Sequence, residues 1–372
     1  MSQGAQGFAE LRDEWQILAN RLSALSFVQC PQWAGGYLQC LTGDSKTLRW
    51  VTVRRAGQLV TVWPLQLVRR EWGPFSLREL TGLSHPHMTL SDVAADPMDA
   101  AIWPQLWRWL ETQKRIEWDR LVLPKLAEDS VLARWIAHGT PELTHSIVID
   151  GSAWLDCQVS FDELLRQASA SKRSNLSRGV KRAAKHGELH YETRNARGGL
   201  AQALEHFLVL EDSGWKGKQG GAIARRPELM AFYRALAQEL GARGECEIDL
   251  LWLGGRLIAS VFWFRTGGQL FLQKIAYREE FAELGPGALI VAEALKRACA
   301  DPSLSRLSFI TRCPWADGWR TRITPVWRYS LYRGSLRGRT GSAIVNTLAH
   351  FNARVKPWVK RLREGPATPE QR

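Results

Sequence analysis

The sequence predicts an α/β fold in which two copies of one unit build mixed sheets flanked by helices. The chain has 372 residues, more than a single average domain needs. Each half contains a hairpin, a loop, a helix and a short strand in the same order, which indicates a duplicated unit. The hairpin sequences Gly57-Gln58-Leu59-Val60 and Gly255-Arg256-Leu257-Ile258 lie 198 residues apart. We therefore expect one domain over residues 1–155, a second over 156–335 and a tail over 336–372.

The first half follows hydrophobic periodicity. Phe8, Leu11 and Trp15 recur at helical spacing, and Gly57 provides the glycine that suits a hairpin turn. In chain order we expect a helical region over 8–41, strands over 48–53 and 59–68, a loop over 82–99, a helix over 100–114 and a strand over 120–123. This half has no glycine-rich junction before its helix. We expect it to be a degenerate copy that forms a substrate groove with the second half.

The second half repeats this order and adds a junction that can bind an anion. We expect strands over 247–253, 257–264 and 269–277, a helix over 288–300 and a strand over 306–309, with glycine turns at Gly254-Gly255 and Gly267-Gly268. The segment Gly285-Pro286-Gly287 precedes the helix, where unpaired N–H groups and the helix dipole favour a pyrophosphate. An ordinary loop-to-helix junction with an early proline has the same sequence, so both readings stay open.

A basic segment, residues 161–190, joins the two halves. We expect a helix that is interrupted near residues 169–174. Lys172, Arg173 and Arg178 are candidates to bind phosphates of a ligand, because a cluster so poor in acids repels itself unless an anion is near. A solvated helical face is the alternative.

A glycine-rich loop follows over residues 211–221, between helices expected over 201–210 and 227–240. Its composition predicts a segment too flexible to hold one shape alone. Loops of this kind often close over substrates, so Trp215 and Lys216 are candidate substrate contacts.

Composition narrows the class of protein. The net charge is +13, and residues 319–363 contain eleven basic residues and no acidic one, which predicts an anionic partner. The six cysteines show no metal or disulfide spacing, and His85-Pro86-His87 lacks a third ligand, so we expect no metal. The start of the chain does not resemble a signal peptide, and no apolar run could span a membrane. We expect a cytoplasmic protein.

Several motifs together resemble a known family. They are the KRSNLSR segment over 172–178, DSGWKGKQGGAI over 212–223, GGRLIA over 254–259 and the W-R-x-R element over 319–322. They resemble the GNAT-fold acyltransferases of the CelD/BcsL type, which are associated with cellulose and other exopolysaccharide biosynthesis. That family is distantly related to the FemABX aminoacyl transferases. Two departures are visible: Arg278 follows Tyr277 where the family usually has aspartate, and Trp319-Arg320 replaces Tyr-Lys.

The resemblance implies a tandem GNAT-like fold and direct acyl transfer. Acyl-CoA would be the co-substrate, and the acceptor would be an amine or hydroxyl of a sugar, a lipid-linked precursor or another envelope precursor. Positioning and oxyanion stabilisation supply most of such catalysis, so no nucleophile motif is required. The candidate residues are Tyr277, Asp212 and His87 for catalysis, Lys274, Gly285, Pro286, Gly287 and Ala288 for the cofactor, and Lys172, Arg173, Arg178, Trp215, Lys216, His85, Trp319 and Arg320 for the substrate.

Two other functions fit the same residues. One is transfer of an aminoacyl group from tRNA, as in FemABX relatives, which the basic segment permits. The other is a non-catalytic accessory role in a polysaccharide-synthesis complex. In the tail, an apolar stripe of Ile344, Leu348, Phe351, Val355, Trp358 and Leu362 runs through basic residues. Such a helix either packs on the protein or lies on an anionic membrane surface through residues 342–363.

Overall fold

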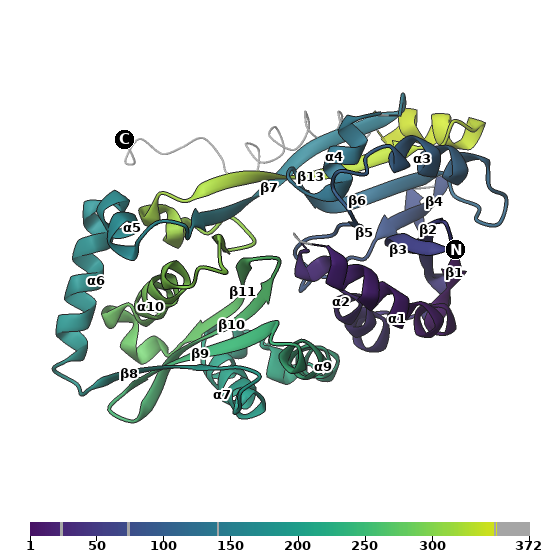
Figure 1. Ribbon diagram of the computed structural model, residues 1–372. Coiled ribbons are helices and arrows are strands. Elements are labelled where there is room, and N and C mark those ends of the chain that lie inside the picture. Colours follow the sequence, from purple (N-terminus) through teal and green to yellow (C-terminus); the bar gives the residue numbers. More distant parts are fainter. Residues whose placement is uncertain (23–24, 73–74, 140, 346, 348–372) are drawn as a thin grey trace, which may run out of the picture.

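The computed structural model of the chain is shown in Figure 1. It describes residues 1–22, 25–72, 75–139, 141–345 and 347, and all structural statements below concern these residues. The first half contains β1 (Ser2–Gln3), α1 (Gly4–Arg21), α2 (Pro31–Gly36), β2 (Leu48–Arg55), β3 (Gln58–Trp72), β4 (Phe75–Gly82), β5 (Ala94–Ala95), α3 (Ile102–Thr112), β6 (Arg120–Ala127) and α4 (Val131–Ala137).

The second half begins after a long strand, β7 (Thr144–Asp156). It contains α5 (Phe161–Gln167), α6 (Ala170–Ala183), β8 (Leu189–Arg194), α7 (Leu200–Ser213), α8 (Trp215–Lys218), α9 (Pro227–Ala242), β9 (Cys246–Leu253), β10 (Arg256–Thr266), β11 (Gln269–Tyr277), α10 (Pro286–Ala300), β12 (Arg306–Ser308) and β13 (Arg322–Tyr332). The predicted strands and helix between residues 247 and 300 are confirmed to within two residues at each end.

One mixed sheet runs through both halves in the order β1-β2-β3-β4-β6-β13-β7-β12-β11-β10-β9-β8. In the first half β2, β3 and β4 are antiparallel and β4 then pairs with β6 in parallel. In the second half β9, β10 and β11 are antiparallel and β11 pairs with β12 in parallel. The predicted repetition is confirmed, because α3 and α10 each connect the two parallel strands of their half.

The two halves exchange a strand. β7 follows the first half in the chain but pairs with β12 of the second, and β13 follows the second half but pairs with β6 of the first. β7 and β13 also pair with each other, and they form the long ribbon that joins the halves in Figure 1. The sequence did not predict these strands, nor β4 and β8. The sheet of the first half therefore continues into β13, which follows the second half in the chain, and the sheet of the second half continues into β7, which precedes it.

Three large hydrophobic cores and two small ones lie among the described residues. The largest combines α1, α2, α7 and α9 from both halves, the second packs α5 and α10 on the second half, and the third packs α3 and α4 on the first half. The predicted turns are confirmed, since Gly254, Gly255, Gly267 and Gly268 have φ of 54°, 80°, 55° and 70°, values that glycine adopts without strain. Within the described ranges, no helix is both long and apolar enough to cross a membrane.

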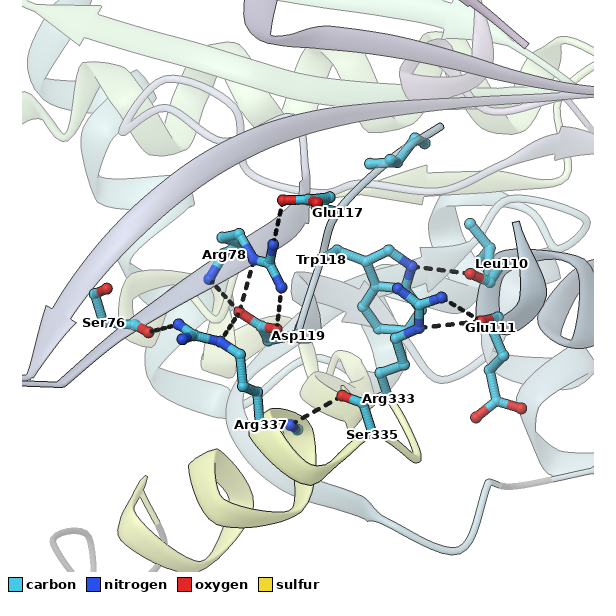
Figure 2. A network of polar contacts seen from close by, with 12 residues as sticks. Ser76, Arg78, Leu110, Glu111, Glu117, Trp118, Asp119, Arg333, Ser335 and Arg337 are labelled. Atoms are coloured by element: carbon cyan, nitrogen blue, oxygen red, sulfur yellow. Dashed lines mark hydrogen bonds and ion pairs between the residues drawn. The ribbon is translucent and has the colours of Figure 1, made fainter. Parts of the chain in front are cut away.

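The start of the tail packs on the first half. Residues 336–345 are helical, and a Cβ at Gly341 would lie 2.7 Å from Leu77, so this helix sits close against β4. Figure 2 shows Arg337 donating to the Ser76 carbonyl at 2.8 Å and facing the buried carboxylate of Asp119, with its Nε 3.5 Å from Asp119 Oδ2. The predicted stripe from Leu348 onward, and with it the membrane-binding prediction, lies outside the described residues.

Candidate active site

Strands β11 and β12 separate soon after they meet. They pair only at Gln269–Phe271 with Arg306–Ser308, whereas β11 continues for six more residues to Tyr277. The edge of β11 beyond Phe271 is therefore not covered by β12. Backbone groups on such an edge must find other partners, and this edge can bind a ligand.

A β-bulge lies at the start of this uncovered edge. Phe262 of β10 pairs with Lys274, but the next residue, Trp263, pairs with Leu272. Gln273 is thus the extra residue on β11, and Gln273 and Lys274 both point away from the core that contains Leu272. Bulges re-aim side chains and are common beside active sites. The structure places the cofactor candidate Lys274 here, next to a residue that sequence reasoning missed.

At the start of α10, the predicted anion site, two of the backbone N–H groups already have hydrogen-bond partners. Gly285 precedes the helix with φ of 65°, and Pro286 is its first residue. The N–H groups of Ala288 and Leu289 donate to the Gly285 carbonyl at 2.9 and 3.1 Å. Because Pro286 has no N–H, Gly287 carries the first N–H group of α10. A Cβ at Gly287 would contact Ile275 and Tyr277 at 3.5 and 3.8 Å, so this turn lies against the uncovered edge of β11.

Helix α6 brings cations to the same place. A pocket of about 330 Å³ is lined by Lys172, Arg178 and Arg182 of α6 and by Gly285 and Ala288. Helix α6 is in close contact with α10 and with the turn before it, because a Cβ at Gly179 would lie 3.3 Å from Leu289 of α10 and only 2.5 Å from the Leu284 carbonyl oxygen of the turn. Two groups of residues that the sequence singled out separately, the basic segment and the Gly-Pro-Gly junction, are thus neighbours.

Lys172 and the predicted residues Arg173 and Trp319 also have structural contacts. Lys172 Nζ donates to the Trp315 carbonyl at 2.9 Å and lies 5.9 Å from the ring centre of Trp319, and burial lowers the pKa of Lys172. Arg173 donates to the Arg166 carbonyl at 3.0 Å, at the end of α5. Trp319 is 1% exposed and lies in the second core. Arg320 follows it, exposed, with φ of 56°.

The far end of β11 contacts the segment predicted to be a flexible loop. Contrary to that prediction, α7 extends to Ser213 and α8 follows directly. Gly217 explains the packing, because a Cβ there would collide with the Asp212 carbonyl. Trp215 and Lys216 lie on α8, and their side chains are outside the described residues.

Two catalytic candidates lie near this end of β11. Asp212 forms an ion pair with Arg225 at 2.6 Å. Tyr277 is 40% exposed and lines a pocket of about 40 Å³ with the buried Glu211.

The third catalytic candidate, His87, lies at the bulge. Its Nδ1 is 3.0 Å from the hydroxyl of Tyr233 on α9, and its carbonyl accepts a hydrogen bond from Gln273 Nε2 at 3.1 Å. Its N–H donates to His85 Nδ1 at 3.2 Å. The residues of the first half therefore touch the uncovered edge of the second. The missed signal was the polar pair Gln273-Lys274, which breaks the apolar alternation of β11.

A groove between the halves lies beside the residues at which β11 and β12 pair. Its pocket of about 220 Å³ is lined by Asp92, Ser130 and Arg134 from the first half and by Phe271 and Ser308 from the second. Asp92 accepts hydrogen bonds from the N–H groups at the start of α4, but burial outweighs these donors and raises the pKa of Asp92 to about 6. Among the described residues, no three His, Cys, Asp or Glu side chains converge on a possible metal site.

Comparison with known proteins supports the fold. Residues 170–316 match the family model of the acetyltransferase (GNAT) domain. The sequence matches no curated protein. The structure of FemX superimposes with a TM-score of 0.57 at 13% identity, covering 86% of this chain and 96% of that one. The C-terminal domain of a protein assigned as a lysylphosphatidylglycerol synthetase from Agrobacterium fabrum gives 0.54 at 10% identity, covering 93% and 97%.

A conserved protein of unknown function from Bacteroides thetaiotaomicron gives a TM-score of 0.50 at 8% identity, covering 87% of this chain and 97% of that one. Identities this low describe the fold and leave the substrate open. The chain has a tandem GNAT-like, acyltransferase-like α/β fold, and its GNAT domain lies at residues 170–316.

Proposed function

We propose that this protein transfers an acyl group from acyl-CoA to an amine or hydroxyl of a sugar or cell-envelope precursor. The observation that carries the proposal is the uncovered edge of β11, which has a bulge at Gln273 and a cationic pocket at the start of α10. The edge suits the acyl chain, and the pocket suits the phosphates of CoA, with the Gly287 N–H and the guanidinium of Arg178 as donors.

The reaction needs no covalent enzyme intermediate. The lone pair of the acceptor attacks the thioester carbonyl carbon, the C–S bond breaks, and the acceptor proton leaves with the thiolate or with solvent. A backbone N–H of β11 near the bulge stabilises the developing oxyanion. Tyr277, Asp212 and His87 remain the candidates for moving the proton, and they are divided between the two ends of the uncovered edge.

The acceptor and location are inferred from relatives. The motifs resemble the CelD/BcsL type, and FemX and the lysylphosphatidylglycerol synthetase domain share the fold. We infer an envelope or exopolysaccharide precursor as acceptor and a place at the cytoplasmic face of the membrane. The basic tail would bring residues 342–363 to anionic lipid.

Calorimetric titration with CoA tests the donor. Gly287→Trp places an indole against Ile275 and Tyr277, and we expect it to weaken CoA binding at least tenfold. Ala101→Trp, at the corresponding helix start of the first half, is the matched control and should bind CoA as the wild type does. Equal CoA affinities for the wild type and both variants would show that CoA does not bind at the start of α10.

A second donor, aminoacyl-tRNA, is favoured by one observation. The exposed face of α6 extends the cations of the pocket through Lys181 and Lys185. If tRNA is the donor, binding of tRNA should fall steeply with salt, and Lys181→Gln/Lys185→Gln should reduce that slope. A protein that binds neither CoA nor tRNA would support the non-catalytic accessory role instead.

A further inference from the structure

Each half contains a glutamine whose side-chain amide contacts a tyrosine hydroxyl. The two glutamines differ in whether the amide oxygen accepts a hydrogen bond. In the first half, Gln66 Oε1 accepts a hydrogen bond from the Tyr37 hydroxyl at 2.7 Å, and Gln66 Nε2 donates to Thr47 Oγ1 at 3.0 Å. Both ends of the Gln66 amide are therefore satisfied. Gln66 therefore serves as the reference for a glutamine with a structural role, in which both ends of the amide are hydrogen-bonded.

Gln273 in the second half is satisfied at one end only. Its Nε2 donates to the His87 carbonyl at 3.1 Å and lies 3.5 Å from the Tyr233 hydroxyl. The side chain is 5% exposed, and among the described residues its Oε1 accepts no hydrogen bond. A buried carbonyl oxygen without a donor costs free energy, and proteins keep few of them.

The orientation of this amide is fixed. Exchanging its oxygen and nitrogen would place Oε1 against the carbonyl oxygen of His87, where two acceptors would repel each other. The Tyr233 hydroxyl is held in turn by His87 Nδ1 at 3.0 Å. Three side chains from β11, α9 and the first half thus hold one carbonyl oxygen in place and leave it unsatisfied.

The position of this oxygen suggests its role. Gln273 is the extra residue of the bulge, at the point where β11 leaves β12. On the proposed function, which this inference requires, the acyl carbonyl would lie at this point. We propose that Gln273 is a positioning residue for the acceptor: Oε1 accepts a hydrogen bond from the N–H or O–H of the attacking group. The amide carbonyl is too weak a base to take the proton, so it only orients the lone pair toward the carbonyl carbon.

This role restricts the class of acceptor. The attacking atom must keep a hydrogen to donate to Oε1 while its lone pair faces the thioester. Primary amines and hydroxyls meet this condition, and tertiary amines do not. A site that pairs a fixed buried acceptor with a donor on the substrate rejects analogues that lack the donor.

Steady-state kinetics with Gln273→Met tests the inference. Acetyl-CoA is the donor, and D-glucosamine and water are the two probe acceptors, with thiol release as the readout. We expect the KM for glucosamine to rise about tenfold, the hydrolysis rate to fall about tenfold, and the KM for acetyl-CoA to stay within twofold. Gln66→Met is the control, because it removes a fully satisfied glutamine on β3 of the first half, and its kinetics should match the wild type.

Urea unfolding of the same variants separates positioning from structure. Gln273→Met loses the Nε2 donor of the His87 carbonyl, but its Oε1 had no partner, whereas Gln66→Met loses hydrogen bonds at both ends of its amide. The unfolding midpoint of Gln273→Met should therefore fall less than that of Gln66→Met. Unchanged kinetics for Gln273→Met, whatever its unfolding midpoint, would show a structural role and overturn the inference. Wild-type protein that binds no CoA would instead overturn the proposed function.

Discussion

Each half contains one pair of parallel strands, and the two pairs differ in how far the first strand continues beyond the residues that pair. In each half three residues of one strand pair with an Arg-Leu-led strand: Glu79–Thr81 with Arg120–Val122, and Gln269–Phe271 with Arg306–Ser308. β4 ends one residue after this pairing, whereas β11 continues for six. In the first half β4 ends close to its pairing with β6, whereas in the second half most of β11 is left uncovered by β12.

The arginines of the two pairs are used differently. Arg120 is buried and donates to Glu79 at 3.1 Å and to Ser330 at 2.7 Å. Arg306 lies opposite the neutral Gln269 and reaches across to Asp129 of the first half at 2.9 Å, with its guanidinium 3.6 Å above the ring of Trp154. The same position thus stabilises the core in one half and the groove between the halves in the other.

The largest expected effect comes from breaking the closed pair. Glu79→Ala leaves the buried Arg120 without its carboxylate, and we expect a loss of about 3 kcal/mol in the free energy of unfolding, the scale found for breaking a buried ion pair. Gln269→Ala, the matched change in the second half, should cost less than about 1 kcal/mol. Urea unfolding measures both. Equal losses would show that the two positions are not distinguished as the structure indicates.

A smaller effect is expected from separating α6 from α10. Gly179→Ala puts a Cβ 2.5 Å from the Leu284 carbonyl oxygen, so either α6 or the turn that leads into α10 must move. We expect CoA binding to weaken about fivefold, as measured by calorimetry, because the cations of α6 would leave the start of α10. Gly43→Ala in the first half is the control, since a Cβ there meets nothing within 4 Å. Unchanged affinity in Gly179→Ala would place the CoA phosphates elsewhere.

The smallest effect concerns Asp92 in the groove and the pH dependence of the free energy of unfolding. Burial raises the pKa of Asp92 to about 6, above the value of about 3.9 in an unfolded chain. Between these values the folded state binds a proton that the unfolded state has lost, so this contribution to stability falls as the pH rises toward 6. From pH 5 to pH 7 the loss is about 1 kcal/mol.

Asp92→Asn should remove this dependence, and urea unfolding at the two pH values measures it. Asp96→Asn is the control. Asp96 is exposed, so this variant should keep the pH dependence of stability that the wild type has. If Asp92→Asn keeps the wild-type slope between pH 5 and pH 7, the carboxyl of Asp92 does not titrate in this range.

Much of the second half could be predicted from the sequence, because local signals coincide there. Apolar runs, glycine turns and a proline at the helix start all lie within residues 246–300, and each strand pairs with its neighbour in the chain. The strands β7 and β13 were missed for the opposite reason. Their partners lie far away in the sequence, and both carry exposed residues such as Ile147 and Ile323 among polar ones, so no regular alternation marks them.

The sequence predicted which types of residue form the candidate site better than it predicted how those residues are arranged. Cations and a Gly-Pro-Gly junction pointed to a phosphate site, and the structure places them around one pocket. The contacts of His87 could not be predicted, since Tyr233 and Gln273 lie 146 and 186 residues away from it. Only the fold brings a loop of the first half to a bulge of the second.

The exchange of β7 and β13 has a consequence for how the chain is made. During synthesis the first half emerges before residues 322–332, the strand that pairs with its β6, because these residues follow the second half in the chain. Residues 144–156, in contrast, wait for a partner strand that does not yet exist. The two halves therefore become stable together, and a gene cut between them should yield fragments that fold only when both are present.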